Sequence, residues 1–176
     1  MKTRLLLFSL ILSCFLGHTS FAQKQKLTPI EYNDKLAALT DSLYNMGVEW
    51  GTAFQQIAGG DKDYSKLAVY RKKIATFTTR KIEEVRRGPT AGKGAEELKA
   101  AMLNFLNFEK NMVDNAFTPL EKLNSASSQA EIDAAIQKLT AESEKESEAL
   151  KSVNTAQEKF GQQNGFSIEE AGDKEE

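Results

Sequence analysis

Histidine and cysteine are almost missing from this sequence of 176 residues, which contains one of each. Both, Cys14 and His18, lie within the first 22 residues, in a segment with the features of an export signal. Removal of that segment leaves a chain with no thiol and no imidazole. This excludes disulfides, thiol chemistry, histidine-based catalysis and most transition-metal sites. We therefore expect no catalytic residues, no metal and no cofactor.

The N-terminal segment has the three parts of a secretory signal peptide. Met1–Arg4 is a short basic region, residues 5–16 are nearly all apolar, and Ala22 is a small residue of the kind a signal peptidase prefers. A run of about twelve apolar residues is too short to span a bilayer as a helix. We therefore predict cleavage after Ala22 and a soluble mature protein in the periplasm or at the cell surface of a Gram-negative bacterium.

A lipidated N-terminus is the alternative. Residues 11–14, Ile-Leu-Ser-Cys, are similar to the motif of bacterial lipoproteins, in which the cysteine becomes the acylated first residue. That motif usually has leucine three positions before the cysteine and a small residue next, where Ile11 and Leu12 stand here. The sequence thus favours soluble export, with lipidation at Cys14 as the second interpretation.

Proline is also scarce, and the abundance of alanine, leucine, glutamate and lysine favours helices over strands. Apolar residues recur at steps of three and four, which is typical of one helix face. Capping-box patterns begin at Thr28, Thr118 and Ser128, and glycines end the first two helices. Four helices are predicted in this way: residues 29–58, 63–87, 95–123 and 129–160.

These helices predict an all-α fold, an elongated antiparallel up-down-up-down four-helix bundle formed by residues 28–166. Pro119 lies inside the third helix, where we expect a kink or a break because proline lacks the backbone donor. A short lead, residues 23–27, precedes the bundle. An acidic tail, residues 167–176, follows it, and we expect its end to be mobile.

The connection at residues 88–94, Gly-Pro-Thr-Ala-Gly-Lys-Gly, superficially resembles a phosphate-binding loop. Its glycines are one residue too close, Gly94 stands where serine or threonine is required, and a helix precedes it instead of a strand. We therefore predict a flexible linker with no nucleotide site.

The fourth helix carries polar residues on its own apolar stripe. The stripe is predicted at Ile132, Ile136, Leu139, Ser143, Glu146, Leu150, Val153, Gln157 and Phe160. A carboxylate on an inward face needs a partner or a solvated cavity. One interpretation is a polar ligand pocket around Ser143 and Glu146, with Trp50 or Tyr44 on its wall. The other is that the helix is half-exposed there and that Glu146 reaches water.

Basic residues gather in the second predicted helix and its flanks. From Asp61 to Lys93 there are ten basic residues against four acidic ones. The candidates for binding an anionic lipid or glycan are Arg71, Lys72, Lys73, Arg80, Lys81, Arg86 and Arg87. The alternative is that these charges pair within the molecule, because the fourth helix and the tail are acidic. The overall charge does not suggest a nucleic-acid partner.

Two short motifs add a family resemblance. Residues 31–35 (Glu-Tyr-Asn-Asp-Lys) open the first helix, and residues 156–160 (Ala-Gln-Glu-Lys-Phe) lead to Asn-Gly-Phe at 164–166. With the signal peptide, this layout resembles a family of small exported helical surface proteins of bacteria, first described in spirochaetes, and the end of the signal resembles those of Bacteroidota. The resemblance implies a cell-envelope location and a helical fold, and it brings no activity.

The sequence therefore favours an envelope protein that acts by binding or scaffolding, not by catalysis. The alternative is a periplasmic carrier of a small ligand or lipid, with a polar cavity in the middle of the bundle. A third hypothesis, an enzyme that uses paired carboxylates, requires two acidic side chains in one cleft. We expect another envelope protein or an anionic lipid or glycan as partner.

Overall fold

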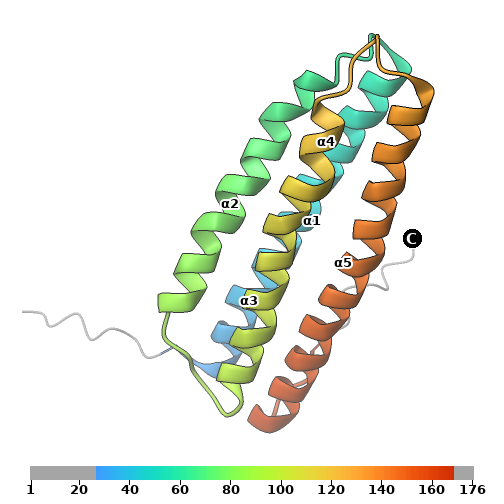
Figure 1. Cartoon of the computed structure of the whole chain (residues 1–176). Coiled ribbons are helices and arrows are strands. Elements are labelled where there is room, and N and C mark those ends of the chain that lie inside the picture. The colour runs from blue at the N-terminus through green and yellow to red at the C-terminus, as the bar shows by residue number, and fades with distance from the viewer. Residues whose placement is uncertain (1–26, 169–176) are drawn as a thin grey trace, which may run out of the picture.

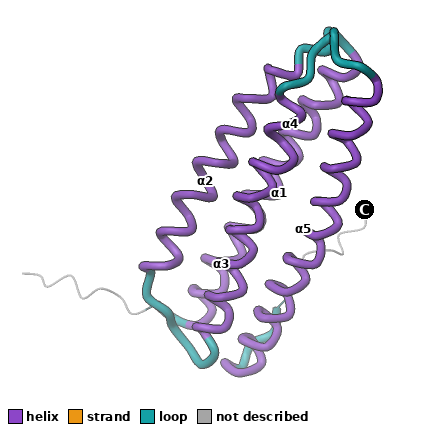
Figure 2. The backbone as a smooth tube through the Cα atoms, in the orientation of Figure 1, coloured by secondary structure: helices purple, strands orange, loops and turns teal. Residues whose placement is uncertain are grey.

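The computed structural model describes residues 27–168. The predicted signal peptide, with Cys14 and His18, and the end of the predicted tail from residue 169 lie outside the described residues. Within residues 27–168 the chain is all-α, as predicted, and contains no strand. Figure 1 shows the long helices side by side, with the chain reversing direction between one long helix and the next. Figure 2 shows the loops gathered at the two ends of this elongated body.

Five α-helices, one 3₁₀ helix and one π-helical segment make up the described part of the chain. They are α1 (Pro29–Gly59), η1 (Tyr64–Leu67, 3₁₀), α2 (Ala68–Arg87), α3 (Ala95–Met112), η2 (Val113–Phe117, π), α4 (Thr118–Glu121) and α5 (Gln129–Asn164). The segments α3, η2 and α4 follow one another without a gap. The helix α3 packs against both α2 and α5, and α1 packs against α2 and, less extensively, against α5. The four predicted helices are thus present.

The first helix matches its prediction most closely. Its capping box is formed: the Glu31 amide donates to Thr28 Oγ1 at 3.2 Å, and the Thr28 amide donates to Glu31 Oε2 at 2.8 Å. The apolar residues that recur at steps of three and four along α1 are all buried, namely Tyr32, Leu36, Leu39, Leu43, Met46, Trp50, Ala53 and Ile57. An uninterrupted stripe of large apolar side chains fixes this helix against the core.

The chain stays helical through Pro119, so of the two outcomes expected there, a kink or a break, the break with a second start at Thr118 does not occur. Thr118 has helical angles (φ −61°, ψ −40°), and its hydroxyl donates to the Val113 carbonyl at 3.0 Å instead of capping a helix. The π-helical segment Val113–Phe117 precedes the proline. A wider turn accommodates a residue that cannot donate to the carbonyl four positions earlier. Glu121, expected to complete the capping box, instead binds Arg71 of α2.

The connection between α2 and α3 is docked on the end of α5, which corrects the prediction of a flexible linker. Asn164 of α5 accepts from the Lys93 amide and donates to the Lys93 carbonyl, both at 2.9 Å. Gly92 has φ +97°, and a Cβ there would lie 2.7 Å from Asn164 Oδ1. The glycine therefore permits a close approach to α5 instead of providing mobility.

The segment after α5, which contains Phe166 and Ile168, folds back on the bundle. The helix extends to Asn164, past the predicted end, and stops at Gly165 (φ +78°). Phe166 then stacks edge to face on Phe160, with ring centres 5.9 Å apart. Gly161 lies under this segment, because a Cβ there would be 2.7 Å from the Phe166 carbonyl oxygen.

Candidate functional site

The middle of α5 faces the bundle with different residues from those predicted. Ser143, Ile136 and Leu150 are exposed, so the prediction that they point inward is wrong. The positions turned toward the bundle are Ile132, Ala135, Leu139, Glu142, Glu146 and Ala149. Alanine at two of these positions lets α5 approach α3 closely, which larger side chains would prevent. Glu146 is the one predicted pocket residue of α5 that faces inward.

Glu146 lies against a second carboxyl group, Glu109 of α3, which the sequence analysis missed. Glu109 is 6% exposed, and its Oε1 has no hydrogen-bond partner among the described residues. The signal was present in the sequence: Glu109 continues the buried series Leu98, Met102, Phe105, Glu109, Met112 and Ala116 at alternating steps of four and three. It was missed because only apolar residues were followed along that face.

The environment of the pair favours its protonated form. Burial, the negative charge of Glu146 and a hydrogen bond to Glu146 raise the pKa of Glu109 to about 8. Burial also raises the pKa of Glu146, against the effect of its hydrogen bond to Glu109. A hydrogen bond between two carboxyl groups needs a proton on one of them, because a carboxylate only accepts. Glu109, the more deeply buried of the two, is therefore the group that holds the proton.

The structure does not bring Trp50 and Tyr44 into one pocket with Ser143. Tyr44 is 73% exposed on the outer face of α1. Trp50 is buried and stacked on Phe117 of η2, with ring centres 4.3 Å apart, and on Phe54 at 5.5 Å. Its indole nitrogen has no hydrogen-bond partner among the described residues. Trp50 thus fills the core.

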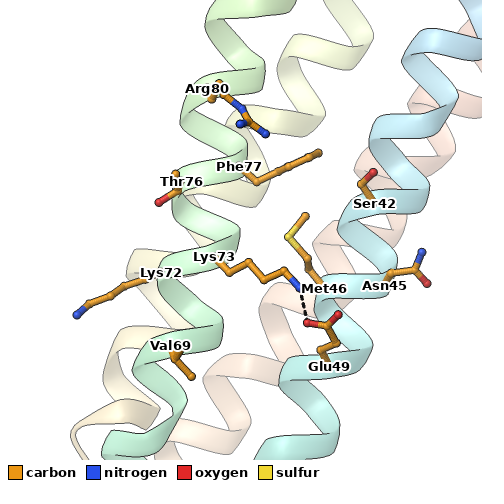
Figure 3. Close-up of a pocket in the computed structure, with 10 residues that line it drawn as sticks. All are labelled: Ser42, Asn45, Met46, Glu49, Val69, Lys72, Lys73, Thr76, Phe77 and Arg80. Carbon is orange, nitrogen blue, oxygen red and sulfur yellow. Dashed lines mark hydrogen bonds and ion pairs between the residues drawn. The ribbon is translucent and has the colours of Figure 1, made fainter.

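An open groove of about 700 Å³ lies between α1 and α2. It is lined by Ser42, Asn45, Met46 and Glu49 of α1 and by Val69, Lys72, Lys73, Thr76, Phe77 and Arg80 of α2. Figure 3 shows Phe77 and Met46 reaching into the space between the helices, whereas Lys72 points away from α1. Lys73 Nζ forms an ion pair with Glu49 Oε2 across the groove, at 2.5 Å. The groove therefore combines an apolar floor with a mostly basic rim.

Most of the predicted basic residues are paired with carboxylates of the same molecule. Arg71 binds Glu121, Lys73 binds Glu49, Arg80 and Lys81 bind Glu84, and Arg86 and Arg87 bind Glu83. Lys81 also lies over the Phe77 ring, 5.8 Å from its centre. Lys72 makes no ion pair with the described residues. Pairing within the molecule, the alternative weighed for this sequence, therefore accounts for most of the positive charge of α2.

No group of three or more potential metal ligands occurs among residues 27–168. No helix in that part of the chain is both long and apolar enough to cross a membrane. Comparison with protein-family models, curated proteins and solved structures finds no match for this chain. The resemblance to exported helical surface proteins therefore stays a prediction, and the candidate sites rest on their own geometry.

Proposed function

We propose that the chain is an exported cell-envelope protein that binds another envelope protein along the groove between α1 and α2, without catalysis. The groove is the observation that carries this proposal. It is open to solvent, and it places the apolar side chains of Met46, Phe77 and the 66% exposed Val69 beside Lys72 and Arg80. An apolar surface with a charged rim is typical of protein-binding sites.

The partner that we propose for the groove is an acidic amphipathic helix of another protein. The groove spans residues 42–49 of α1, which is about two helical turns. A helix laid in it places apolar side chains on Met46 and Phe77 and carboxylates beside Lys72 and Arg80. An anionic membrane or glycan surface is less well supported, because such binding depends on several unpaired cations and six of the seven candidates are already paired.

The carrier and enzyme hypotheses have less support. The carrier needs a polar cavity around Ser143 and Glu146, but Ser143 lies on the surface and Glu146 lies against Glu109. The Glu109–Glu146 pair has the composition of a glycosidase site, yet Glu109 is 6% exposed and is not among the residues that line the α1–α2 groove. A substrate has no access to a carboxyl group buried in this way.

Export belongs to the same proposal and has a separate test. Intact-mass analysis of the protein from its native host should give a chain that begins at Gln23. A chain that begins at an acylated Cys14 would show the lipidated alternative. Recovery of the full chain from Met1 in the cytoplasm would contradict export.

A charge-reversal experiment tests the groove. Solubilised envelope proteins of the native host are passed over the immobilised protein and over its Lys72→Glu and Lys151→Glu variants. Lys151→Glu is the control, because it reverses the charge of an exposed lysine on α5, away from the groove. The proposal expects a bound protein that Lys72→Glu loses and Lys151→Glu retains. Binding of phosphatidylglycerol vesicles with the same dependence on Lys72 would indicate a membrane surface instead. Retention that is equal for all three proteins would contradict the proposal.

A further inference from the structure

The middle of α5 is held to the bundle by little apolar surface. Between Ala135 and Val153 no residue of this helix is fully buried. The positions that face the bundle there are half-buried: Leu139, Glu142, Glu146 and Ala149. The helices α1, α2 and α3 instead bury side chains along most of their length. Attachment of this part of α5 therefore depends strongly on what Glu146 contacts.

Glu146 contacts Glu109, and the state of that contact depends on one proton. With one proton the two carboxyl groups share a hydrogen bond across the α3–α5 interface. With no proton, two negative charges face each other where solvent is largely excluded, and neither group can donate. Oε1 of Glu109 has no described hydrogen-bond donor, so this oxygen is not stabilised by a hydrogen bond when the group is ionised.

No described cation is positioned to take the place of that proton. The buried side chains of α1 and α2 carry no charge, and neither do those of η2 and α4. The charged side chains around the middle of the bundle are paired or exposed. The ion pairs are Glu49 with Lys73, Arg71 with Glu121 and Glu142 with Lys145. Lys110 and Asp114 lie at the surface. Protonation is therefore the means by which the pair is neutralised.

We propose that Glu109 and Glu146 form a proton-operated latch: the shared proton holds the middle of α5 against α3, and its loss releases that part of α5. Release uncovers apolar side chains of α3, among them Phe105 and Met112, one turn before and one turn after Glu109. The raised pKa of Glu109, about 8, places the change in the mildly alkaline range. The latch is a device of the α3–α5 interface and does not depend on what occupies the α1–α2 groove.

Hydrogen exchange measured by mass spectrometry at pH 6.5 and pH 9.5 tests the latch. After correction for the intrinsic exchange rate, the amides of residues 139–152 should open at least tenfold more often at pH 9.5. Between the ordinary carboxyl pKa of 4.5 and the raised pKa of about 8, each pH unit multiplies the opening constant by up to about ten, and above pH 8 the constant levels off. The amides of residues 36–53 in α1 should not follow. In Glu109→Gln, which keeps a hydrogen-bonding side chain without the charge, the increase should disappear.

Two further variants complete the design. Glu144→Gln removes an exposed carboxylate of the same helix and should behave as the wild type does. Glu146→Gln removes the other half of the pair, so it replaces Glu109→Gln if that variant does not fold. A corrected opening rate in residues 139–152 that is the same at both pH values would overturn the proposal. So would an equal increase in all four helices, or an increase that survives in Glu109→Gln or in Glu146→Gln.

Discussion

At the scale of single residues, the core formed by residues 27–168 contains two buried side-chain atoms with no hydrogen-bond partner among those residues, Trp50 Nε1 and Glu109 Oε1. Trp50→Ala should lower the free energy of unfolding by about 3–5 kcal/mol, because it removes the stack on Phe117 and leaves a cavity. Trp50→Phe should lower it by less than half as much, because it keeps an aromatic ring and removes an unpaired donor. Urea denaturation checks both values.

Tyr44→Ala, at an exposed position, is the control and should stay within about 0.5 kcal/mol of the wild type. Equal losses for Trp50→Ala and Tyr44→Ala would contradict the assignment of Trp50 to the core.

At the scale of elements, two helical glycines with opposite surroundings provide a matched pair. A Cβ added at Gly47 of α1 would meet no neighbouring side chain or packed element within 4 Å, so Gly47→Ala should stabilise the protein by about 0.5–1 kcal/mol through helix propensity. Gly161 of α5 lies under the Phe166 carbonyl, so Gly161→Ala should destabilise it by about 1–3 kcal/mol by displacing the returning segment. Thermal unfolding of the two variants measures the contrast. Stabilisation by Gly161→Ala would show that the segment after α5 does not pack as described.

The docked connection between α2 and α3 gives a second prediction at this scale. Asn164→Ala removes the bonds to both backbone groups of Lys93 and should cost about 1–3 kcal/mol. It should also increase hydrogen exchange in residues 90–94. Gln162→Ala, an exposed neighbour on the same helix, is the control and should change neither quantity. Unchanged exchange in Asn164→Ala would mean that the loop is ordered by something else.

The helices differ in how much of their structure could be predicted from the sequence. For α1, one stripe of large apolar residues admits one orientation, and every predicted core position is buried. For α5, two stripes at the same spacing compete, one with Ile136 and Leu150 and one with Ala135 and Ala149. The alanine stripe faces inward because α3 lies close, and this distance is a tertiary property absent from the α5 sequence. The capping-box pattern at Thr118 and the glycine at position 92 were misinterpreted for a similar reason, since a π-turn and a docked loop depend on neighbouring elements.

At the scale of the whole molecule, the buried carboxyl pair gives stability a pH dependence that is unusual for a protein rich in surface carboxylates. The pKa of Glu109 is raised from 4.5 to about 8 in the folded state, so the unfolded state loses this proton first as pH rises. The contribution to stability is fully present below about pH 4.5 and is lost progressively up to about pH 8, at no more than about 1.4 kcal/mol per pH unit. Urea denaturation between pH 5 and pH 9 should show this decline in the wild type and a flatter profile in Glu109→Gln. Matching profiles for the two proteins would contradict a buried, protonated Glu109.

The described part of the chain is an elongated helical body with a buried apolar core and an open groove between α1 and α2. We propose that another protein occupies this groove. Cross-linking in living cells of the native host tests it most directly, with a photoreactive amino acid in place of Thr76, which lines the groove, or of Thr155, which is exposed on α5. The account predicts an adduct with a second polypeptide from position 76, lost when Lys72→Glu is added, and none of the same mass from position 155. Adducts that form equally from both positions, or that position 76 forms only with lipid, would contradict it.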